Sequence, residues 1–290
     1  MMDKINKLLL RTETEQARIY RRAEKDVEDI VFPLLLSIIL DDPDATQRCR
    51  IQYANKGRKK SKVVKAMTDI MLDANKQSVV LVNDHASSVW DIGYKYIYDH
   101  VKAETGIDLW EPTETGMTSR IFQEKAERAR LREAILAELN KSIKSGVGRA
   151  EVADALIGRI NKEKALARTL ARTDTTRAVN EGREAACLEL WELGIEIWKV
   201  WLHMPISKEP RPHHMAMSGE KRRPGKMFPN GGLYPGDPSL PGEERYNCNC
   251  RIKPEISNLS TLNNARKLAK TDGVEITVDN IKRYIRMATQ

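Results

Sequence analysis

The segment from Met204 to Arg251 limits most strongly how this chain can fold. It contains eight prolines and six glycines. Proline lacks the amide hydrogen that a helix or a central strand needs, and both residue types favour turns. Aromatic side chains that need burial, Phe228, Tyr234 and Tyr246, lie in the same segment. We therefore predict ordered loops and short strands here, and no helix.

The residues just before this segment follow the pattern of a strand. IEIWKVWL, from Ile195 to Leu202, alternates and is rich in β-branched and aromatic residues. The alternation puts Ile197, Lys199 and Trp201 on one side of the strand. A short antiparallel sheet is therefore expected between this strand and the loops that follow it.

Most of the remaining chain has helical periodicity. In the N-terminal half, helices are predicted over residues 12–40 (interrupted near Pro33), 66–82, 85–101 and 118–145. After the glycine break at 145–149, a short amphipathic helix carries Val152, Leu156 and Ile160 on one face, and a long helix over 162–193 ends at Gly194. Two weaker helical patterns cover 258–270 and 278–287.

These patterns predict an α+β fold in three parts. A long helical region over residues 1–145 precedes a small α+β domain over 146–254, which has a short antiparallel sheet and ordered Pro/Gly-rich loops. A helical tail over 255–290 follows. Two domains are within the size prior for 290 residues.

The charge of the chain favours an anionic partner. The formal net charge is +8 and the isoelectric point is near 9.2. Residues 56–65 hold six bases and no acid, and residues 208–226 hold six bases against two acids. Such a run is either a solvated surface or a phosphate-contacting patch. The candidates for DNA contact are Lys56, Arg58, Lys59, Lys60, Lys62 and Lys65.

Several protein classes do not fit this sequence. Four cysteines in 290 residues do not make a disulfide scaffold, which favours a reducing cytoplasm. The most apolar run, Ile30 to Leu40, is shorter than the roughly 20 residues that span a bilayer, so no membrane partner is expected. The first residues lack the pattern of a secretory signal.

No catalytic motif is present, and we predict that the chain is not an enzyme. G-x-S-x-G, H-E-x-x-H, G-x-x-x-x-G-K-[ST] and G-x-G-x-x-G are all absent from the sequence. Arg211, His214, Glu243 and Glu244 are types that could serve acid/base chemistry. Their spacing does not require that role.

Two groups of polar residues are candidates for a site. Thr173, Thr176, Asn180 and Arg183 are spaced by three, four and three, so they share one helix face. They either bond locally or hold the proline-rich loop through its backbone groups. The second group is His213, His214, Cys248 and Cys250, which are zinc-ligand types with unusual spacing. It is either a zinc site or buried cysteines beside a solvated histidine pair.

Five ordered segments together resemble the phage Mu F-like family of head-morphogenesis proteins. They are ARTDTTRAVNEGR at 171–183, RPHHMAMSG at 211–219, Phe228, YPGDP at 234–238 and EERYNCNCR at 243–251. The family pattern has an A-R-T helix with a downstream Asn and Arg, a turn containing His and Gly, an aromatic, P-G-D-P and a terminal N-C-R-C. The N-terminal helical half is not covered.

The resemblance implies structural or docking roles at the matching positions. These are Arg172, Thr173, Asn180, Arg183, Arg211, His214, Gly219, Phe228, Tyr234, Pro235, Gly236, Asp237, Asn247, Cys248 and Cys250. The chain departs at Asn249, where the family usually has Arg, so a positive charge between the cysteines is not carried over. It also lacks the C-x-x-C that some relatives carry near Arg211.

The family resemblance implies a minor capsid protein of a tailed bacteriophage. Such a protein is in the host cytoplasm during assembly, attaches to the portal protein inside the procapsid, and has its expected place in the virion, inside the head near the portal. It supports head assembly and genome packaging or ejection. Scaffolding protein, major capsid protein and packaged double-stranded DNA are further expected partners. Two alternatives remain: a toxin-like transferase or nuclease, and a free DNA-binding protein.

Overall fold

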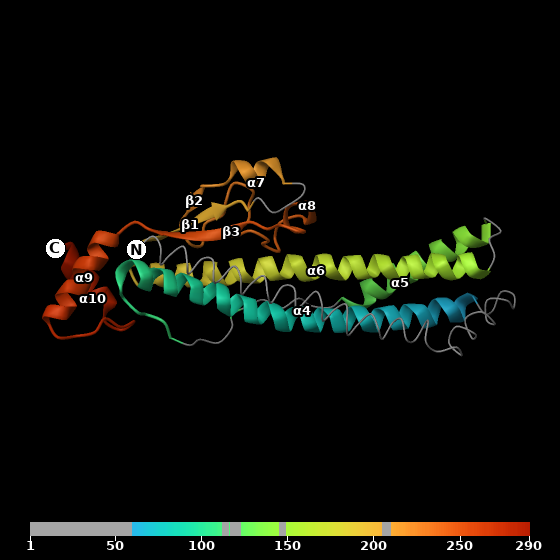
Figure 1. The fold of residues 1–290 in the computed structure, drawn as a ribbon, viewed down its shortest axis with the longest axis horizontal. Helices are drawn as coiled ribbons and strands as arrows, with labels where there is room; N and C mark the ends of the chain where they lie inside the picture. Colours follow the sequence, from blue (N-terminus) through green and yellow to red (C-terminus); the bar gives the residue numbers. More distant parts are fainter. Residues whose placement is uncertain (1–59, 112–115, 117–122, 145–148, 205–209) are drawn as a thin grey trace. The chain divides into compact units, whose positions relative to one another are not determined.

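The computed structural model describes residues 60–111, 116, 123–144, 149–204 and 210–290 (Figure 1). The predicted helix over 12–40 and the candidates Lys56, Arg58 and Lys59 lie outside the described residues. The helices are α4 (Lys60–Thr105), α5 (Glu124–Lys144), α6 (Arg149–Glu192), α7 (Pro212–Ala216), α8 (Gly242–Arg245), α9 (Leu259–Thr271) and α10 (Ile281–Thr289). The strands are β1 (Ile197–Leu202), β2 (Lys221–Arg222) and β3 (Arg251–Ile256).

The described residues fall into two compact units. Residues 85–111, 116, 172–204 and 210–290 form the first, called here the mixed unit because it contains the sheet. Residues 60–84, 123–144 and 149–171 form the second, called the helical unit. Both α4 and α6 contribute residues to each unit.

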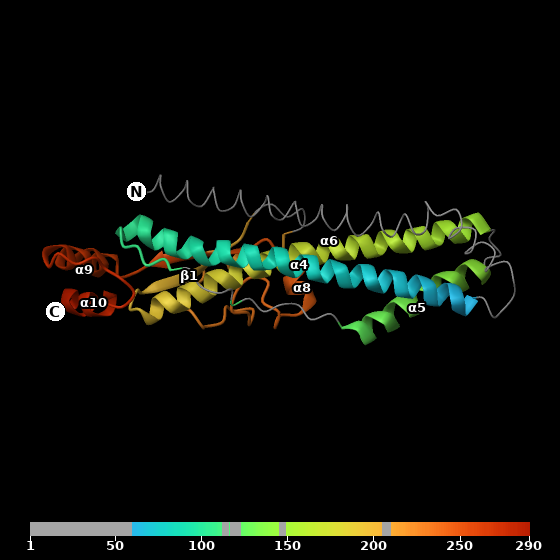
Figure 2. The same ribbon diagram turned by 90° about the horizontal axis from the view of Figure 1, so that it is seen from below.

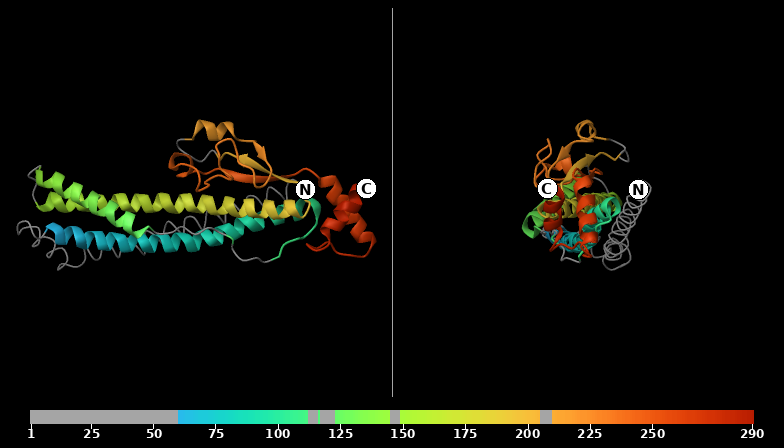
Figure 3. Two further views of the ribbon diagram at one scale, coloured as in Figure 1. Left: turned by 180° about the vertical axis from the view of Figure 1, so that it is seen from behind. Right: turned by 90° about the vertical axis from the view of Figure 1, so that its left-hand side faces the viewer.

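The predicted α+β class is confirmed, with long helices and a small antiparallel sheet. The strand order is β2-β1-β3, so β1 is central. In the register, Trp201 lies opposite Ile252, and Lys199 lies opposite both Arg222 and Pro254. Within the mixed unit the sheet covers one side of the C-terminal part of α6, and α9 and α10 lie at the end of that helix (Figures 1 and 3).

Two helices are longer than predicted. α4 covers both predicted helices at 66–82 and 85–101, and α6 covers both the short helix after the glycine break and the helix over 162–193. The residues at the predicted breaks, such as Asn83 and Asp84, cost less than about 1 kcal/mol each in a helix, so they weaken it without ending it. Neither α4 nor α6 contains a proline that would break it.

The predicted end of α6 is confirmed. Gly194 has φ of 90°, the left-handed conformation that glycine adopts without strain. The Ile195 amide donates to the Leu190 carbonyl at 3.0 Å, and the Gly194 amide donates to the Trp191 carbonyl at 3.0 Å. These bonds satisfy the last carbonyls of the helix, and the chain then turns back into β1.

The prediction that no helix forms between 204 and 251 is wrong for two short ones. α7 begins with Pro212, and α8 has Pro241 as its N-cap. Proline is tolerated at these positions because the amides of a first helical turn have no partner within the helix. The prolines therefore begin these helices instead of preventing them.

The core of the mixed unit depends on close contact between α4 and α6, whose segments within this unit run side by side (Figures 1 and 2). A Cβ at Gly182 would lie 2.3 Å from the Trp90 carbonyl oxygen, and one at Gly93 would lie 2.2 Å from the Val179 carbonyl oxygen. Only glycine permits this approach. Buried aromatic and aliphatic side chains of α4, α6, α9 and α10 fill the rest of the core, including Ile97 and Ile281 as well as Trp90.

The helical unit is held by a buried carboxylate. Glu163 of α6 is 3% exposed and accepts hydrogen bonds from Arg130 at 2.5 Å, from Asn75 at 3.3 Å and from Arg159. Glu127 accepts from Arg130 and Asn75 as well, at 2.5 and 2.6 Å. Residues of α4, α5 and α6 thus share one ion-pair network.

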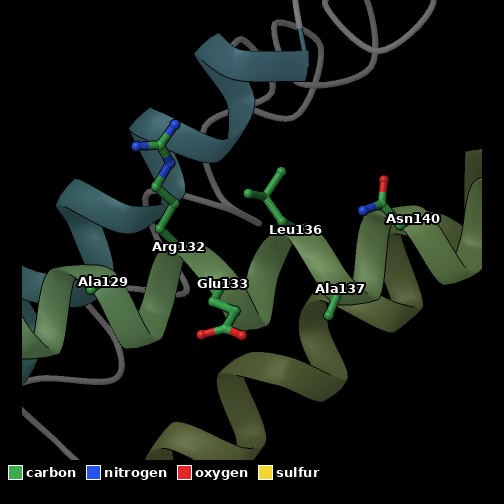
Figure 4. Close-up of a pocket in the computed structure, with 6 residues that line it drawn as sticks. All are labelled: Ala129, Arg132, Glu133, Leu136, Ala137 and Asn140. Atoms are coloured by element: carbon green, nitrogen blue, oxygen red, sulfur yellow. The ribbon is translucent and has the colours of Figure 1, made fainter.

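A pocket on α5 adds no candidate site. It is lined by Ala129, Arg132, Glu133, Leu136, Ala137 and Asn140. Figure 4 shows that all six come from this one helix, with Arg132 and Leu136 pointing away from Glu133. Most are exposed, so the pocket is an open depression that does not converge on a ligand.

Candidate metal centre

The polar face of α6 holds the loops of the mixed unit through their backbone. Asn180 has no exposed surface. Its Nδ2 donates to the Pro235 carbonyl at 3.1 Å and to the Cys250 carbonyl at 3.0 Å, and its Oδ1 accepts from the Ile252 amide at 2.9 Å. One side chain therefore joins the Y-P-G-D-P loop and the start of β3 to the helix.

Two further residues of the same face also bond to backbone groups outside α6. Arg183 donates to the Ile252 carbonyl at 2.8 Å, and its guanidinium lies 4.3 Å from the Tyr96 ring centroid. Thr173 Oγ1 accepts from the Asn247 amide at 3.2 Å. These bonds support the prediction that the face clamps the proline-rich loop. Local bonding also occurs, because Asn180 donates to the Thr176 carbonyl at 3.0 Å.

The Y-P-G-D-P loop is ordered by its own aspartate. Asp237 accepts from the Leu233 amide at 2.7 Å and from the Ser239 amide at 2.8 Å. Gly236 has φ of 87°, and a Cβ there would lie 3.2 Å from the Cα of Arg177. Glycine thus lets the loop lie directly on α6.

A buried ion pair beside this loop is absent from the sequence predictions. Lys199 of β1 donates to Glu184 of α6 at 2.8 Å and to the Leu233 carbonyl at 2.6 Å. Burial lowers the pKa of Lys199, although Glu184 opposes this shift, and burial raises the pKa of Glu184. The sequence held one sign of this ion pair: Lys199 lies on the same side of the strand as the apolar Ile197 and Trp201, where a charge needs a buried partner.

Three of the four predicted metal-ligand candidates lie together. His214 comes from α7, and Cys248 and Cys250 come from the chain just before β3; all three are buried. Their ligand atoms lie within 4.8 Å of one another. His214 Nδ1 is 3.6 Å from Cys248 Sγ and 3.6 Å from Cys250 Sγ. The ring of Trp201 packs edge-on against His214, with centroids 5.3 Å apart.

The fourth candidate, His213, faces a carboxylate instead. Glu244 of α8 pairs with His213 Nε2 at 2.8 Å and with His214 Nε2 at 2.9 Å. Burial raises the pKa of Glu244, but hydrogen bonds from the two histidines outweigh it and leave the pKa lowered. Burial lowers the pKa of His214, but Cys248 and Glu244 outweigh it and leave the pKa raised.

The two thiols affect each other's pKa. A hydrogen bond between Cys248 and Cys250 lowers the pKa of Cys248 and raises the pKa of Cys250. His214 lowers the pKa of Cys248 further. These interactions favour the thiolate form of Cys248, and thiolate is the form of cysteine that binds a metal.

The remaining predicted residues have diverse positions. Phe228 and Tyr234 are buried, Gly219 has φ of 95°, and Arg211 donates to the Tyr246 carbonyl at 2.6 Å. Arg172 is exposed.

The described candidates for DNA contact lie on one helix. Lys60, Lys62 and Lys65 belong to the first turns of α4, and Lys65 is exposed. Of the suggested acid/base residues, His214 and Glu244 are in contact, whereas Glu243 is exposed.

One histidine of the site was missed. His203 follows β1, and its Nδ1 lies 3.7 Å from Cys250 Sγ. His203, His214 and Cys250 line the same small cavity. No motif includes His203, because only the pairing of β1 with β3 brings it next to Cys250.

The fold and the site together define a small α+β domain clamped on a long helix, with a Cys/His group at one end of its sheet. No family model, curated protein or solved structure matches the chain. In the part of the chain that the structure describes, no helix has the length and apolar character needed to cross a bilayer.

Proposed function

We propose that this chain is a minor capsid protein of a tailed bacteriophage that acts in head morphogenesis. The observation that carries the proposal is the mutual bonding of the motif segments. Asn180 of the A-R-T helix bonds to Pro235 of Y-P-G-D-P and to Cys250 of the terminal N-C-N-C. Segments that follow one another in the family pattern are thus hydrogen-bonded to one another in the fold. This supports the view that the pattern specifies a fold.

The proposed role is architectural. Most motif residues of the mixed unit are buried, and Thr173, Asn180 and Arg183 bond to backbone groups of the loops. The proposal is that they shape a rigid docking module instead of facing a substrate. The portal protein inside the procapsid is the proposed main partner, with scaffolding or major capsid protein beside it. The basic residues that begin α4, such as the exposed Lys65, are proposed to face packaged DNA.

We also propose that His214, Cys248 and Cys250 hold a zinc ion. Thiolate and imidazole are the ligands that Zn²⁺ prefers in structural sites, whereas Mg²⁺ and Ca²⁺ prefer oxygen. The ion would join α7 to the start of β3. Such a crosslink helps a domain whose sheet has only three strands.

The test is co-purification of the full chain with the portal protein encoded in the same gene cluster. Stable association at fewer copies than portal subunits is the expected result. Asn180→Ala, which releases both loops from α6, should reduce the captured amount severalfold. Asn264→Ala, at an exposed position of α9, should not.

Other outcomes would overturn the proposal in favour of the two alternatives. No capture at low salt, together with duplex affinity that falls steeply with salt, would indicate a free DNA-binding protein. A nucleotide-dependent activity that is lost on His214→Ala and Glu244→Gln would indicate an enzyme. The contact between those two side chains, at 2.9 Å, is the observation that keeps this second alternative.

A further inference from the structure

We infer that His203 is the fourth ligand of the zinc ion, which makes the site a closed Cys₂His₂ centre. The inference rests on the proposed zinc ion and names a residue that no motif contains. Three protein ligands alone would leave an open position of the kind that catalytic zinc sites keep. A fourth protein ligand makes the site structural, in agreement with the architectural role.

The spacing of the ligand atoms suits a tetrahedral ion. Zn–S and Zn–N bonds of roughly 2.3 and 2.1 Å at the tetrahedral angle place sulfur and nitrogen about 3.6 Å apart. The three measured separations are 3.6, 3.6 and 3.7 Å, the last between His203 Nδ1 and Cys250 Sγ. His203 thus already has the correct spacing from one of the two cysteines.

The small cavity beside the cluster supplies the route for the fourth ligand. His203, His214 and Cys250 all line it. Closing the site requires the His203 ring to turn into this cavity, toward the other ligand atoms. Its backbone is anchored, because the His203 amide donates to Ser218 Oγ at 3.3 Å and the residue follows directly after β1.

His213 is the competing fourth ligand, and the geometry disfavours it. Its side chain is 51% exposed, and its Nε2 is paired with Glu244. Among the described residues, His213 groups with His214 and Glu244, on the Nε2 side of the His214 ring and not on the thiol side. A metal shared with the cysteines must lie on the Nδ1 side.

Glu244 is a positioning residue in this arrangement. When the His214 Nε2–H donates to Glu244, the Nδ1 lone pair is directed at the two sulfurs. Metal-bound histidines commonly have such a carboxylate partner, which fixes the ring and its tautomer. Trp201 also contacts this ring, edge-on.

The test compares two histidines in the purified full chain. Bound zinc is counted per chain by mass spectrometry of the metal, and zinc affinity is measured by competition with a chromophoric chelator. His203→Ala should weaken affinity roughly 10-fold or more, and His213→Ala should leave it within about twofold. His203→Cys should restore tight binding, because a thiolate can take the same position.

Cobalt gives an independent readout of coordination number. Co²⁺ in the wild-type chain should give the intense visible bands of a four-coordinate centre with thiolate ligands. These bands should weaken in His203→Ala and persist in His213→Ala. Equal affinity and equal spectra for the two alanine variants would overturn the inference about His203.

The two proposals fail in different ways. If the wild-type chain binds no zinc, or binds it equally well after Cys248→Ser and Cys250→Ser, the zinc proposal itself fails. If binding needs both cysteines but is insensitive to His203→Ala, zinc stands and the closed site is wrong. Portal capture is measured separately, so the head-morphogenesis proposal does not depend on either result.

Discussion

At the scale of single residues, the buried Lys199 is expected to affect the stability of the fold strongly. It has no exposed surface, and its ammonium lies 2.8 Å from Glu184. Each charge was taken out of water on folding, which costs several kcal/mol unless the pair is well bonded. Glu184 also accepts the Gly225 amide at 2.7 Å, so the pair connects β1, α6 and a loop.

Lys199→Met should destabilise the chain in a pH-dependent manner. The Glu184 carboxylate would stay buried without its cation, so its pKa, already raised by burial, would rise further. A folded-state pKa above the unfolded value means that the native state binds more protons. Stability is therefore lost as pH rises from about 4.3 through the folded pKa, with about 3 to 5 kcal/mol lost at neutral pH. Urea unfolding at several pH values measures this.

The control is an exposed lysine of the same sheet. Lys221 pairs with Glu255, and both side chains are about half exposed. Exposed pairs contribute little, so Lys221→Met should cost less than about 1 kcal/mol at every pH. A pH-independent loss in Lys199→Met would show that packing, and not the unpaired carboxylate, causes the destabilisation.

At the scale of elements, the contact of α4 with α6 depends on two glycines. Both would place a Cβ far inside the contact distance of the opposite backbone. Gly182 was visible in the sequence as the only glycine of the predicted helix over 162–193. The need for a glycine at this position could not be predicted, because the helix that packs against it is about 90 residues away in the chain.

Gly182→Ala and Gly158→Ala should have opposite effects. Both glycines lie inside α6, so alanine improves helix propensity equally, by up to about 1 kcal/mol. At Gly182 the added methyl group meets the Trp90 carbonyl, and separating the helices should cost about 2 kcal/mol or more. At Gly158 nothing lies within 4 Å, so the net effect is stabilising. Thermal unfolding followed by circular dichroism distinguishes these signs.

The close contact would be contradicted if both alanine variants changed the stability in the same, stabilising direction. If both alanine variants raise the melting temperature, α4 and α6 do not approach as closely as the structure has them. Gly93→Ala provides a second check from the other helix, because its Cβ would meet Val179.

At the scale of the whole molecule, the two units have separate stabilising networks. Glu163 bonds only to residues of the helical unit among its described partners, namely Arg130, Arg159 and Asn75. The described partners of Asn180 all belong to the mixed unit. Local opening should therefore follow the division into units.

Glu163→Ala and Asn180→Ala should increase amide exchange in different places. Glu163→Ala leaves two arginines without their buried acceptor, so exchange should rise in α5. Asn180→Ala leaves backbone groups of Cys250 and Ile252 unpaired, so exchange should rise in β3. Hydrogen exchange with mass spectrometry reads both segments in one experiment, and each variant is the control for the other. A rise in both segments for either variant would mean that the units open together.

The sequence by itself determined the class of fold and the polar face of α6. Periodicity, the Gly194 cap and the alternation before Leu202 are local signals, so they can be read without the fold. The spacing of Asn180 and Arg183 on one helix face is a local signal as well. It predicted that this face would bond to the backbone of the loops, as it does in the structure. The uninterrupted helices were not predicted, because packing outweighs weak local breaks such as Asn83.

Only the tertiary structure decided which distant residues meet. His203 and Cys250 are 47 positions apart, and Lys199 and Glu184 lie on different elements. Their contacts follow from the register of β1 with β3 and from the packing of β1 against α6. Neither leaves a periodic signal, because a contact between elements depends on how their surfaces fit and not on the spacing within either one.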